Sequence, residues 1–428
     1  MLAAMSTAAR RSSPQATGVP RVRADACPGS LRLHAADDGT LARIRVPGGV
    51  LTVRQAEALG EAAERLGDGE LHLTSRGNVQ LRGLRGECGG ELTQLLDTAG
   101  LSPSPAHERV RNIVASPLSG VDGRGVREVR PWLTDLDAAL CASETAQALS
   151  GRFLFALDDG RGDVAGLGAD VTVRATEDDS AQLALGTGPE ALRLSAEDAA
   201  RGSLLAAETF VEAVQASGTH AWRVDELSCQ RGELLQMVSH RLRAEGIAHG
   251  RRTRDTAHAD GPLIGAVGNG LSVHVPLGRL SALRWRELTR VAVGELRLTP
   301  WSGVVLPATR ADADEPLARL AAVGLVTDPG SPWLRVGACI GRPGCAKSRA
   351  DVQSDATAAL GTVGPNDLPL YWSGCERRCG RPRGDRIDVV AAPAGGYRLS
   401  TAVRGQHPRT ADLDDPSRLP AALAAITS

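Results

Sequence analysis

The chain of 428 residues is poor in lysine and in aromatic side chains, and it has no long apolar run. Lys347 is its one lysine, so a site for anions must be built from arginine. Guanidinium groups bind carboxylates through paired hydrogen bonds, which suits a ligand with carboxylate groups. Aromatic residues make up 3%, which leaves few rings for stacking on single-stranded nucleic acid. A membrane helix needs about 20 consecutive apolar residues, and no segment approaches that length.

Charge and cysteine content exclude further classes of protein. The formal net charge of −1 gives no overall field toward nucleic acid or anionic lipid, so we expect neither partner. Eight cysteines are too few for a disulfide scaffold, and their paired spacing favours a metal site in a reducing compartment, which predicts a cytoplasmic protein. Residues 1–24 contain no acidic side chain, as in a transit peptide, and no apolar block of a secretory signal. We interpret them as a disordered tail, with an upstream start before Met5 as an alternative.

The sequence also repeats its own pattern. Two parts of the chain follow the same order: strand, glycine turn, amphipathic helix, strand and polar loop. The first copy comprises residues 46–59 and 70–81, and the second comprises residues 275–288 and 295–306. A further helix is predicted over 194–215, with Ser195 as its N-cap. Looser matches pair residues 111–120 with 335–344, 150–160 with 371–380, and 170–175 with 386–392. The chain is therefore predicted to be a pseudo-twofold duplication of a small and a large unit that each mix helices with strands.

Four cysteines stand in two pairs, spaced C-x5-C and C-x3-C: Cys339, Cys345, Cys375 and Cys379. Buried structural thiols would not require the glycines and prolines that surround both pairs. Zinc usually takes tighter pairs, spaced C-x2–4-C. A [4Fe–4S] cluster needs four thiolates on loops that bend around it, and glycine turns provide backbone N–H groups for its sulfides. The pattern favours an iron–sulfur cluster, with structural thiols and zinc as the alternatives.

These cysteines, the segment LTSRGNVQL at 73–81 and the segment RNIVASP at 111–117 together resemble the sulfite/nitrite reductase superfamily. The resemblance spans nearly the whole chain and implies an α+β, pseudo-twofold duplicated fold with two ferredoxin-like half-domains and two larger α/β domains. It implies that the four cysteines bind a [4Fe–4S] cluster, with Cys379 facing a tetrapyrrole that is usually sirohaem. The expected boundaries are 1–24 for the tail, 25–100 and 262–328 for the half-domains, 101–248 for the first large domain and 329–428 for the cluster-binding domain.

The same resemblance suggests residues for binding the carboxylates of a tetrapyrrole. Arg76 and Arg111 fall where the family places anion-binding arginines, and Asn78 extends the same loop as Arg76. The family also has two lysines at alternate positions of a strand. Arg152 takes the first of these positions, whereas Leu154 occupies the second. For each arginine the alternative interpretation is a solvated loop residue.

Leu154 removes a cation that reduction of sulfite or nitrite would use. Cys27-Pro28-Gly29, the LDDG at 157–160, the compact length and Thr299-Pro300-Trp301 resemble the precorrin-3B synthase branch of the superfamily instead. That resemblance implies conversion of precorrin-3A to precorrin-3B with O2, by hydroxylation and γ-lactone formation, in aerobic cobalamin biosynthesis. It also implies a second, mononuclear non-haem iron. The alternative is a sirohaem-dependent sulfite or nitrite reductase.

Some components of such an enzyme have no clear sequence signal. No GxGxxG in a strand–helix context is present, so we expect a separate electron-donor protein. No two-histidine, one-carboxylate motif identifies ligands for the second iron. His72 lies close to the loop of Arg76, and we expect it to be packed or exposed on a strand. Cys27 is either a thiolate ligand or a small buried residue, and Trp301 either stacks on a macrocycle or packs in the core.

Overall fold

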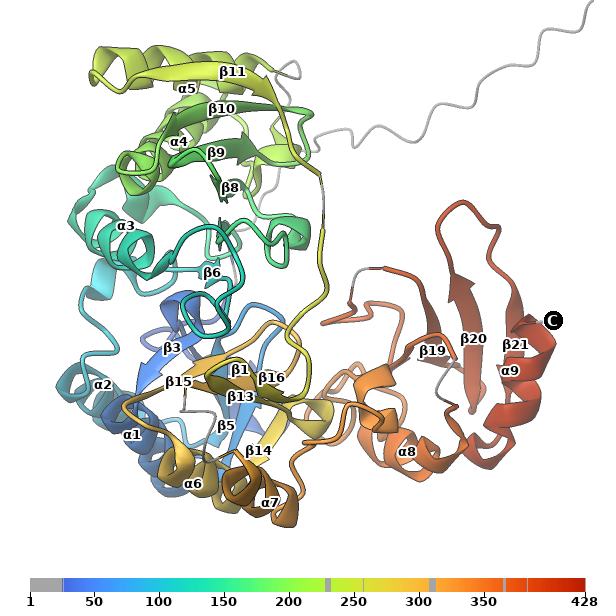
Figure 1. Ribbon diagram of the computed structural model, residues 1–428. Helices are drawn as coiled ribbons and strands as arrows, with labels where there is room; N and C mark the ends of the chain where they lie inside the picture. Colours follow the sequence, from blue (N-terminus) through green and yellow to red (C-terminus); the bar gives the residue numbers. More distant parts are fainter. Residues whose placement is uncertain are drawn as a thin grey trace, which may run out of the picture.

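The computed structural model describes residue 25 and residues 27–227, 232–256, 258–307, 313–364, 367–382 and 384–427. The tail expected over 1–24 lies outside these residues. Four β-sheets with flanking helices build the described chain (Figure 1). None of the helices within those ranges combines the length and the apolar character that a membrane span requires.

The two ferredoxin-like halves exchange strands. In each half, the strand that leads into the first helix joins the sheet of the other half: β3 pairs with β15, and β14 pairs with β4. The strands of the first sheet, in spatial order, are β1 (His34–Ala36), β2 (Gly39–Ile44), β5 (Val79–Leu84), β4 (Glu70–Leu73) and β14 (Arg279–Ser281). Those of the second are β12 (Gly265–Val267), β13 (Gly270–His274), β16 (Gly303–Pro307), β15 (Glu295–Leu298) and β3 (Val50–Thr52). Each half is therefore completed by the other.

One apolar core lies between these two sheets and the helices on their outer side, and it contains buried residues from both halves. The helices are α1 (Val53–Leu66), α2 (Gly89–Thr98), α6 (Ala282–Val291) and α7 (Asp314–Ala322). Helix α1 begins with a capping box in which Thr52 and Gln55 satisfy each other's backbone N–H groups. Helices α1 and α6 lie close together because Trp285 is fully buried and donates from its indole nitrogen to the carbonyl of Ala56, at 2.7 Å.

The two larger domains repeat one strand order. In the first domain β6, β7 and β8 are parallel neighbours and β9 then runs antiparallel; in the second, β17, β18 and β19 are parallel and β20 runs antiparallel. The first sheet contains β6 (Ile113–Ala115), β7 (Phe155–Asp158), β8 (Val171–Thr176), β9 (Ser180–Leu185), β10 (Glu190–Ser195) and β11 (His249–Thr253). The second contains β17 (Val336–Ala338), β18 (Leu370–Ser373), β19 (Arg386–Ala391), β20 (Tyr397–Ala402) and β21 (Thr410–Leu413). This correspondence confirms the predicted duplicated α+β fold.

The helices of the larger domains are α3 (Arg130–Ala142), α4 (Ala199–Ser217), α5 (Glu233–Ala244), α8 (Val352–Ala358) and α9 (Leu419–Thr427). The helix predicted over 194–215 begins later than expected. Ser195 is the last residue of strand β10. The N-cap of α4 is Asp198, whose backbone N–H donates to the Ser195 hydroxyl. The predicted start was wrong because the alternating apolar residues of 190–195 pair with β9 as a strand.

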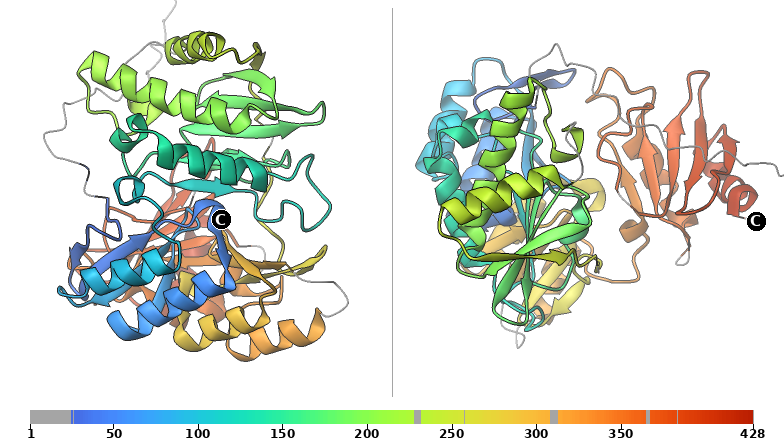
Figure 2. Two further views of the ribbon diagram at one scale, coloured as in Figure 1. Left: turned by 90° about the vertical axis from the view of Figure 1, so that its left-hand side faces the viewer. Right: turned by 90° about the horizontal axis from the view of Figure 1, so that it is seen from above.

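The C-terminal sheet stands beside the joined half-domains, and Figure 1 and the right-hand view of Figure 2 show it as a separate layer. Arg82 on β5 donates to the carbonyl of Gly344 at 2.6 Å and forms a two-point ion pair with Asp38. Asp37 accepts from the backbone N–H of Ala346. These bonds fix the position of the loop that contains Cys345 against the first half-domain.

The contact between α1 and α6 yields a stability prediction. A Cβ at Gly60 would lie 2.8 Å from Cδ1 of the Trp285 indole, which is too close for an unshifted core. Gly60→Ala should therefore destabilise the protein by about 1–3 kcal/mol, although alanine is the better helix former. Gly90→Ala in α2 is the matched control, because its Cβ would meet nothing within 4 Å. Thermal unfolding should show a lower Tm for the first variant alone; equal or higher Tm values for both would contradict the packing described.

Candidate functional site

The four cysteines of the predicted cluster lie on two loops at one edge of the C-terminal sheet. Cys339 directly follows β17, and Cys375 comes shortly after β18. Because β17 and β18 are parallel neighbours, their carboxyl ends meet at the same sheet edge, where open α/β sheets bind ligands. The two loops are also bonded to each other, since Gly374 donates to the Cys339 sulfur at 3.3 Å and Arg349 donates from its backbone to the carbonyl of Gly374.

The four thiols do not form a compact group in the described part of the chain. Within the described chain, no three of these four thiols have their sulfurs all within 4.8 Å of one another. Zinc binds sulfur at about 2.3 Å, so its thiolates lie about 4 Å apart. Burial raises the pKa of the Cys339 thiol, and the neighbouring Cys379 and Cys375 add to the effect. Positive charge from a bound metal centre would stabilise the thiolate form of these cysteines.

At the corresponding sheet edge of the first large domain, the polar groups hydrogen-bond to one another. Asp158, at the end of β7, accepts hydrogen bonds from four backbone N–H groups of the loop that follows it: those of Gly160, Gly162, Val164 and Ala165. Asp163 in that loop accepts from the hydroxyl of Ser116, which follows β6, at 2.6 Å. Asp158, Asp159 and Asp163 are close enough to hold an ion. Arg161 and these backbone groups already satisfy them, so we assign this cluster a structural role.

A second cluster, the guanidinium face, joins the first half-domain to the first large domain. It consists of five arginines around Cys27: Arg43, Arg45, Arg76, Arg152 and Arg223. The Cys27 sulfur accepts from Arg45 at 3.2 Å and from Arg43 at 3.5 Å, and it is buried. Among the described residues only two carboxylates form ion pairs with this face. Asp170 pairs with Arg223 at 2.6 Å, and Asp25 lies 3.8 Å from Arg152.

Arg76 is the least compensated member of the guanidinium face. Burial, followed by repulsion from Arg223 and Arg45, lowers its pKa to about 10. No described residue accepts a hydrogen bond from the Arg76 guanidinium or forms an ion pair with it. Within the same part of the chain, the Nη1 atom of Arg45 is buried without a hydrogen-bond partner. Unpaired cations held together in a half-buried place are costly unless an anion joins them, so this face is suited to a polyanionic ligand.

An apolar patch borders the guanidinium face. Leu154 is buried with Val114 and Ala156, and the half-buried Trp301 packs against this group. The patch adjoins the arginines because the backbone N–H of Leu154 donates to Asp170, the carboxylate that also binds Arg223. Leu154 thus lies in an apolar environment. Trp301 packs against the same group, which was one of the two roles expected for it. Within this group only Trp301 is half-buried, so it is the side chain that offers apolar surface beside the arginines.

The structure brings Arg76 and Arg152 together but not the other two predicted ligand residues. Arg111 is buried, with Nε and Nη2 bound by Asp137 at 2.8 and 2.7 Å and Nη1 bound to the carbonyl of Leu101. Asn78 is buried too: it accepts from the backbone of Val46 and donates to Asn112. Their hydrogen bonds hold the loops in place, so we leave both out of the proposed site.

Arg43, Arg45 and Arg223 were missed by sequence analysis. The alternation of Arg43 and Arg45 around the buried Ile44 indicates a cationic face of a strand, which is a usable signal. Arg223 has no local pattern, because it reaches the face through the fold of the large domain and through its pairing with Asp170.

Comparisons with known proteins agree with the duplicated fold. The family model described as the nitrite/sulfite reductase ferredoxin-like half domain matches residues 34–97. The chain is 26% identical over 406 residues to a precorrin-3B synthase from Sinorhizobium sp, covering 90% of this chain and 85% of that protein. It is 28% identical over 396 residues to a ferredoxin–nitrite reductase from Synechococcus elongatus, covering 82% and 76%. The solved structure of the Mycobacterium tuberculosis NirA protein matches with a TM-score of 0.69 at 17% identity, covering 89% and 79%, and supports the fold.

The buried acidic loop gives a pH-dependent prediction. Burial, together with the charge of Asp158, raises the pKa of Asp163 from 3.8 to about 7. A raised pKa in the folded state contributes stability that is complete below the unfolded value and is lost as pH rises to the folded value. Asp163→Asn should therefore gain Tm relative to wild type as pH increases from 4 to 7, after which the difference levels. Calorimetry at several pH values tests this, with the exposed Asp135→Asn as control. A Tm difference that does not change with pH would refute it.

Proposed function

Because the chain belongs to the sulfite/nitrite reductase superfamily, we propose that it is an oxygenase of the precorrin-3B synthase type. The reaction consumes precorrin-3A, one O2, two electrons and two protons, and yields precorrin-3B and one water. One oxygen atom enters the substrate as a hydroxyl group, and a ring acetate closes a γ-lactone. The observation that carries this proposal is the guanidinium face, with Arg76 unpaired among the described residues, beside an apolar patch at Leu154.

Each part of the site has a role in this proposal. Arg76 and Arg152 bind substrate carboxylates, and Arg43 and Arg45 extend that cationic surface. The half-buried Trp301 contacts the apolar macrocycle, and the buried cluster of Leu154 supports it from behind. Because Leu154 is apolar and buried, its position on the strand contributes no cation for holding sulfite or nitrite.

The residues present fit an iron–sulfur cluster. Four thiols lie on two loops at one sheet edge, and a backbone N–H is directed at the Cys339 sulfur. We propose that Cys339, Cys345, Cys375 and Cys379 hold a [4Fe–4S] cluster, which would supply electrons one at a time from a separate donor protein. Among the described residues no group combines two histidines with a carboxylate, so we assign no step to a second iron of that type.

The direct test is turnover. Anaerobically purified protein, precorrin-3A and a chemical reductant should yield, on admission of O2, a product with one added oxygen atom and a lactone, identified by mass spectrometry and NMR. An incubation without O2 is the control and should leave the substrate unchanged.

The reductase alternative predicts different results from the same preparation, and the matches to ferredoxin–nitrite reductases justify testing it. Tightly bound sirohaem would give a Soret band and a red-region band, and the protein would reduce nitrite or sulfite with reduced ferredoxin. Those observations, together with unchanged precorrin-3A, would overturn the proposal.

Substrate binding should depend on Arg76. Arg76→Gln removes a charge-assisted bond to a carboxylate, which is worth about 1.5–3 kcal/mol, or roughly a 10–100-fold increase in Kd for precorrin-3A. Arg54→Gln, on the exposed side of α1, is the matched control and should leave Kd unchanged. Fluorescence quenching under anaerobic conditions measures both. Equal Kd values for Arg76→Gln and wild type would remove Arg76 from the site.

The cluster ligands can be tested by composition. Cys379→Ser replaces an exposed thiol, so the variant should fold, yet it should lose most of its iron, its acid-labile sulfide and its brown colour. Cys88→Ser alters a buried thiol outside both loops and should retain the full content. Iron and sulfide assays and near-ultraviolet to visible absorption provide the measurement. Full iron and sulfide content in Cys379→Ser would contradict the assignment.

A further inference from the structure

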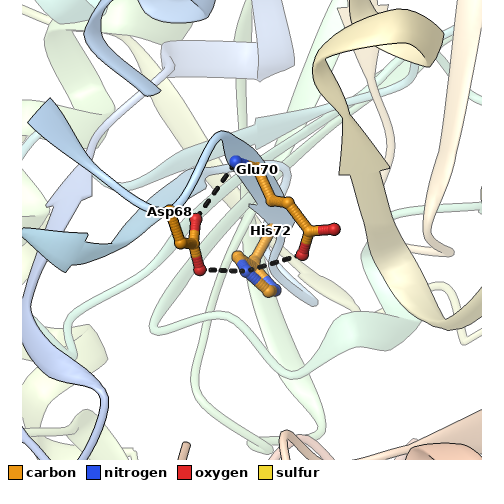
Figure 3. A group of neighbouring side chains, drawn as sticks. All are labelled: Asp68, Glu70 and His72. Atoms are coloured by element: carbon orange, nitrogen blue, oxygen red, sulfur yellow. Dashed lines mark hydrogen bonds and ion pairs between the residues drawn. The ribbon is translucent and has the colours of Figure 1, made fainter. Parts of the chain in front are cut away.

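Three side chains at the outer part of the first half-domain sheet converge without a role in the site described above. Asp68 precedes β4, and Glu70 and His72 belong to it. Leu71 between them packs into the core, so Glu70 and His72 point to the opposite face of the sheet. Figure 3 shows the His72 ring between the two carboxylates. One ligand atom from each of the three lies within 4.8 Å of the others.

His72 is the observation that points to a ligand. The residue is 8% exposed, and no described residue hydrogen-bonds its Nε2 atom, which is buried. This atom lies 3.8 Å from a carboxylate oxygen of Asp68 and 3.9 Å from one of Glu70, too far for hydrogen bonds. The space between this buried imidazole nitrogen and the two carboxylates lies where a bound cation would contact all three groups.

The second repeat shows that His72 is not needed to neutralise Glu70. The corresponding residues are Glu295 and Arg297, which pair with each other at 2.9 Å, and Val50 lies opposite Arg297 on the neighbouring strand. In the first repeat the arginine comes from the neighbouring strand instead. Arg279 lies opposite His72 and pairs with Glu70. The position that holds arginine in one repeat therefore holds histidine, a common metal ligand, in the other.

From this geometry we propose that Asp68, Glu70 and His72 form a binding site for a divalent transition-metal ion. One imidazole nitrogen and two carboxylate oxygens are ligands that Mn²⁺, Fe²⁺ and Zn²⁺ accept, whereas Mg²⁺ and Ca²⁺ prefer oxygen alone. Each ligand needs to move only slightly toward a shared ion, and the exposed Asp68 gives the ion a route of entry. This inference does not depend on the proposed reaction.

The site is connected to the guanidinium face by one row of side chains across the sheet. His72 lies opposite Gln80, and Gln80 lies opposite Arg43. In the amide orientation that satisfies both groups, the Gln80 oxygen accepts from the Arg43 guanidinium. Arg279 competes with the ion for Glu70, so its removal should strengthen metal binding.

Manganese is the probe, because Mn²⁺ has little affinity for thiolates and its free ion gives a strong EPR signal. The full chain, purified anaerobically with its cluster and dialysed against a chelator, is titrated with Mn²⁺. Wild type should bind one equivalent, and the bound ion should show electron spin-echo modulation from a ¹⁴N nucleus. His72→Leu should lose that modulation and weaken binding at least about tenfold. Arg279→Gln should tighten binding.

Two further variants keep the test decisive. Asp68→Asn alters an exposed side chain, so it should fold even if His72→Leu does not, and it should also weaken binding. Asp163→Asn, in the acidic loop of the large domain, should bind Mn²⁺ as wild type does. The proposal is overturned if wild type binds no Mn²⁺, if the bound ion lacks nitrogen modulation, or if Asp68→Asn and Asp163→Asn weaken binding equally.

Discussion

The central physical constraint in this molecule is mutual repulsion among the arginines of the guanidinium face. The fold holds them together nonetheless. Arg43 lies on β2 and Arg45 directly follows that strand, and both donate to the Cys27 sulfur, while Asp170 holds Arg223. Arg76 is placed beside them by the turn after β4, and its lowered pKa reflects burial and the neighbouring charges. Such an arrangement persists at little cost only if the folded protein meets an anion there, which is why a ligand with several carboxylates is the natural occupant.

The duplication explains how one scaffold supports several chemistries. At the edge where two parallel strands end, the first large domain has Asp158, Asp163 and Ser116, which satisfy one another and the backbone. The second large domain has four thiols at the same edge, and among them only Cys339 accepts a hydrogen bond from a described residue. In the half-domains, the place of Arg297 in one copy is taken by His72 in the other. In each pair one copy is closed by its own side chains, and the other holds the residues for which we propose a ligand.

Much of this architecture was predictable, for identifiable reasons. The helix–strand units of the half-domains could be predicted because amphipathic spacing and glycine turns are local signals. The exchange of β3 and β14 was not predictable, because the sequence of a three-residue strand does not specify which half it pairs with. Arg111 was assigned to the ligand by resemblance, whereas its partner Asp137 on α3 becomes visible only in the folded chain. Arg43 and Arg45 had a usable strand pattern, but the convergence of five arginines depends on tertiary structure.

The most direct test of the guanidinium face as a carboxylate site is how binding affinity depends on the number of carboxylates on the ligand. Metal-free porphyrins with eight and with four carboxylates have similar rings and differ mainly in charge, so titration of both into the anaerobic protein isolates the contribution of the guanidinium face. The account predicts that the eight-carboxylate ring binds at least about tenfold more tightly, and that this preference shrinks as salt concentration rises. Equal affinities for the two rings at low salt would contradict it.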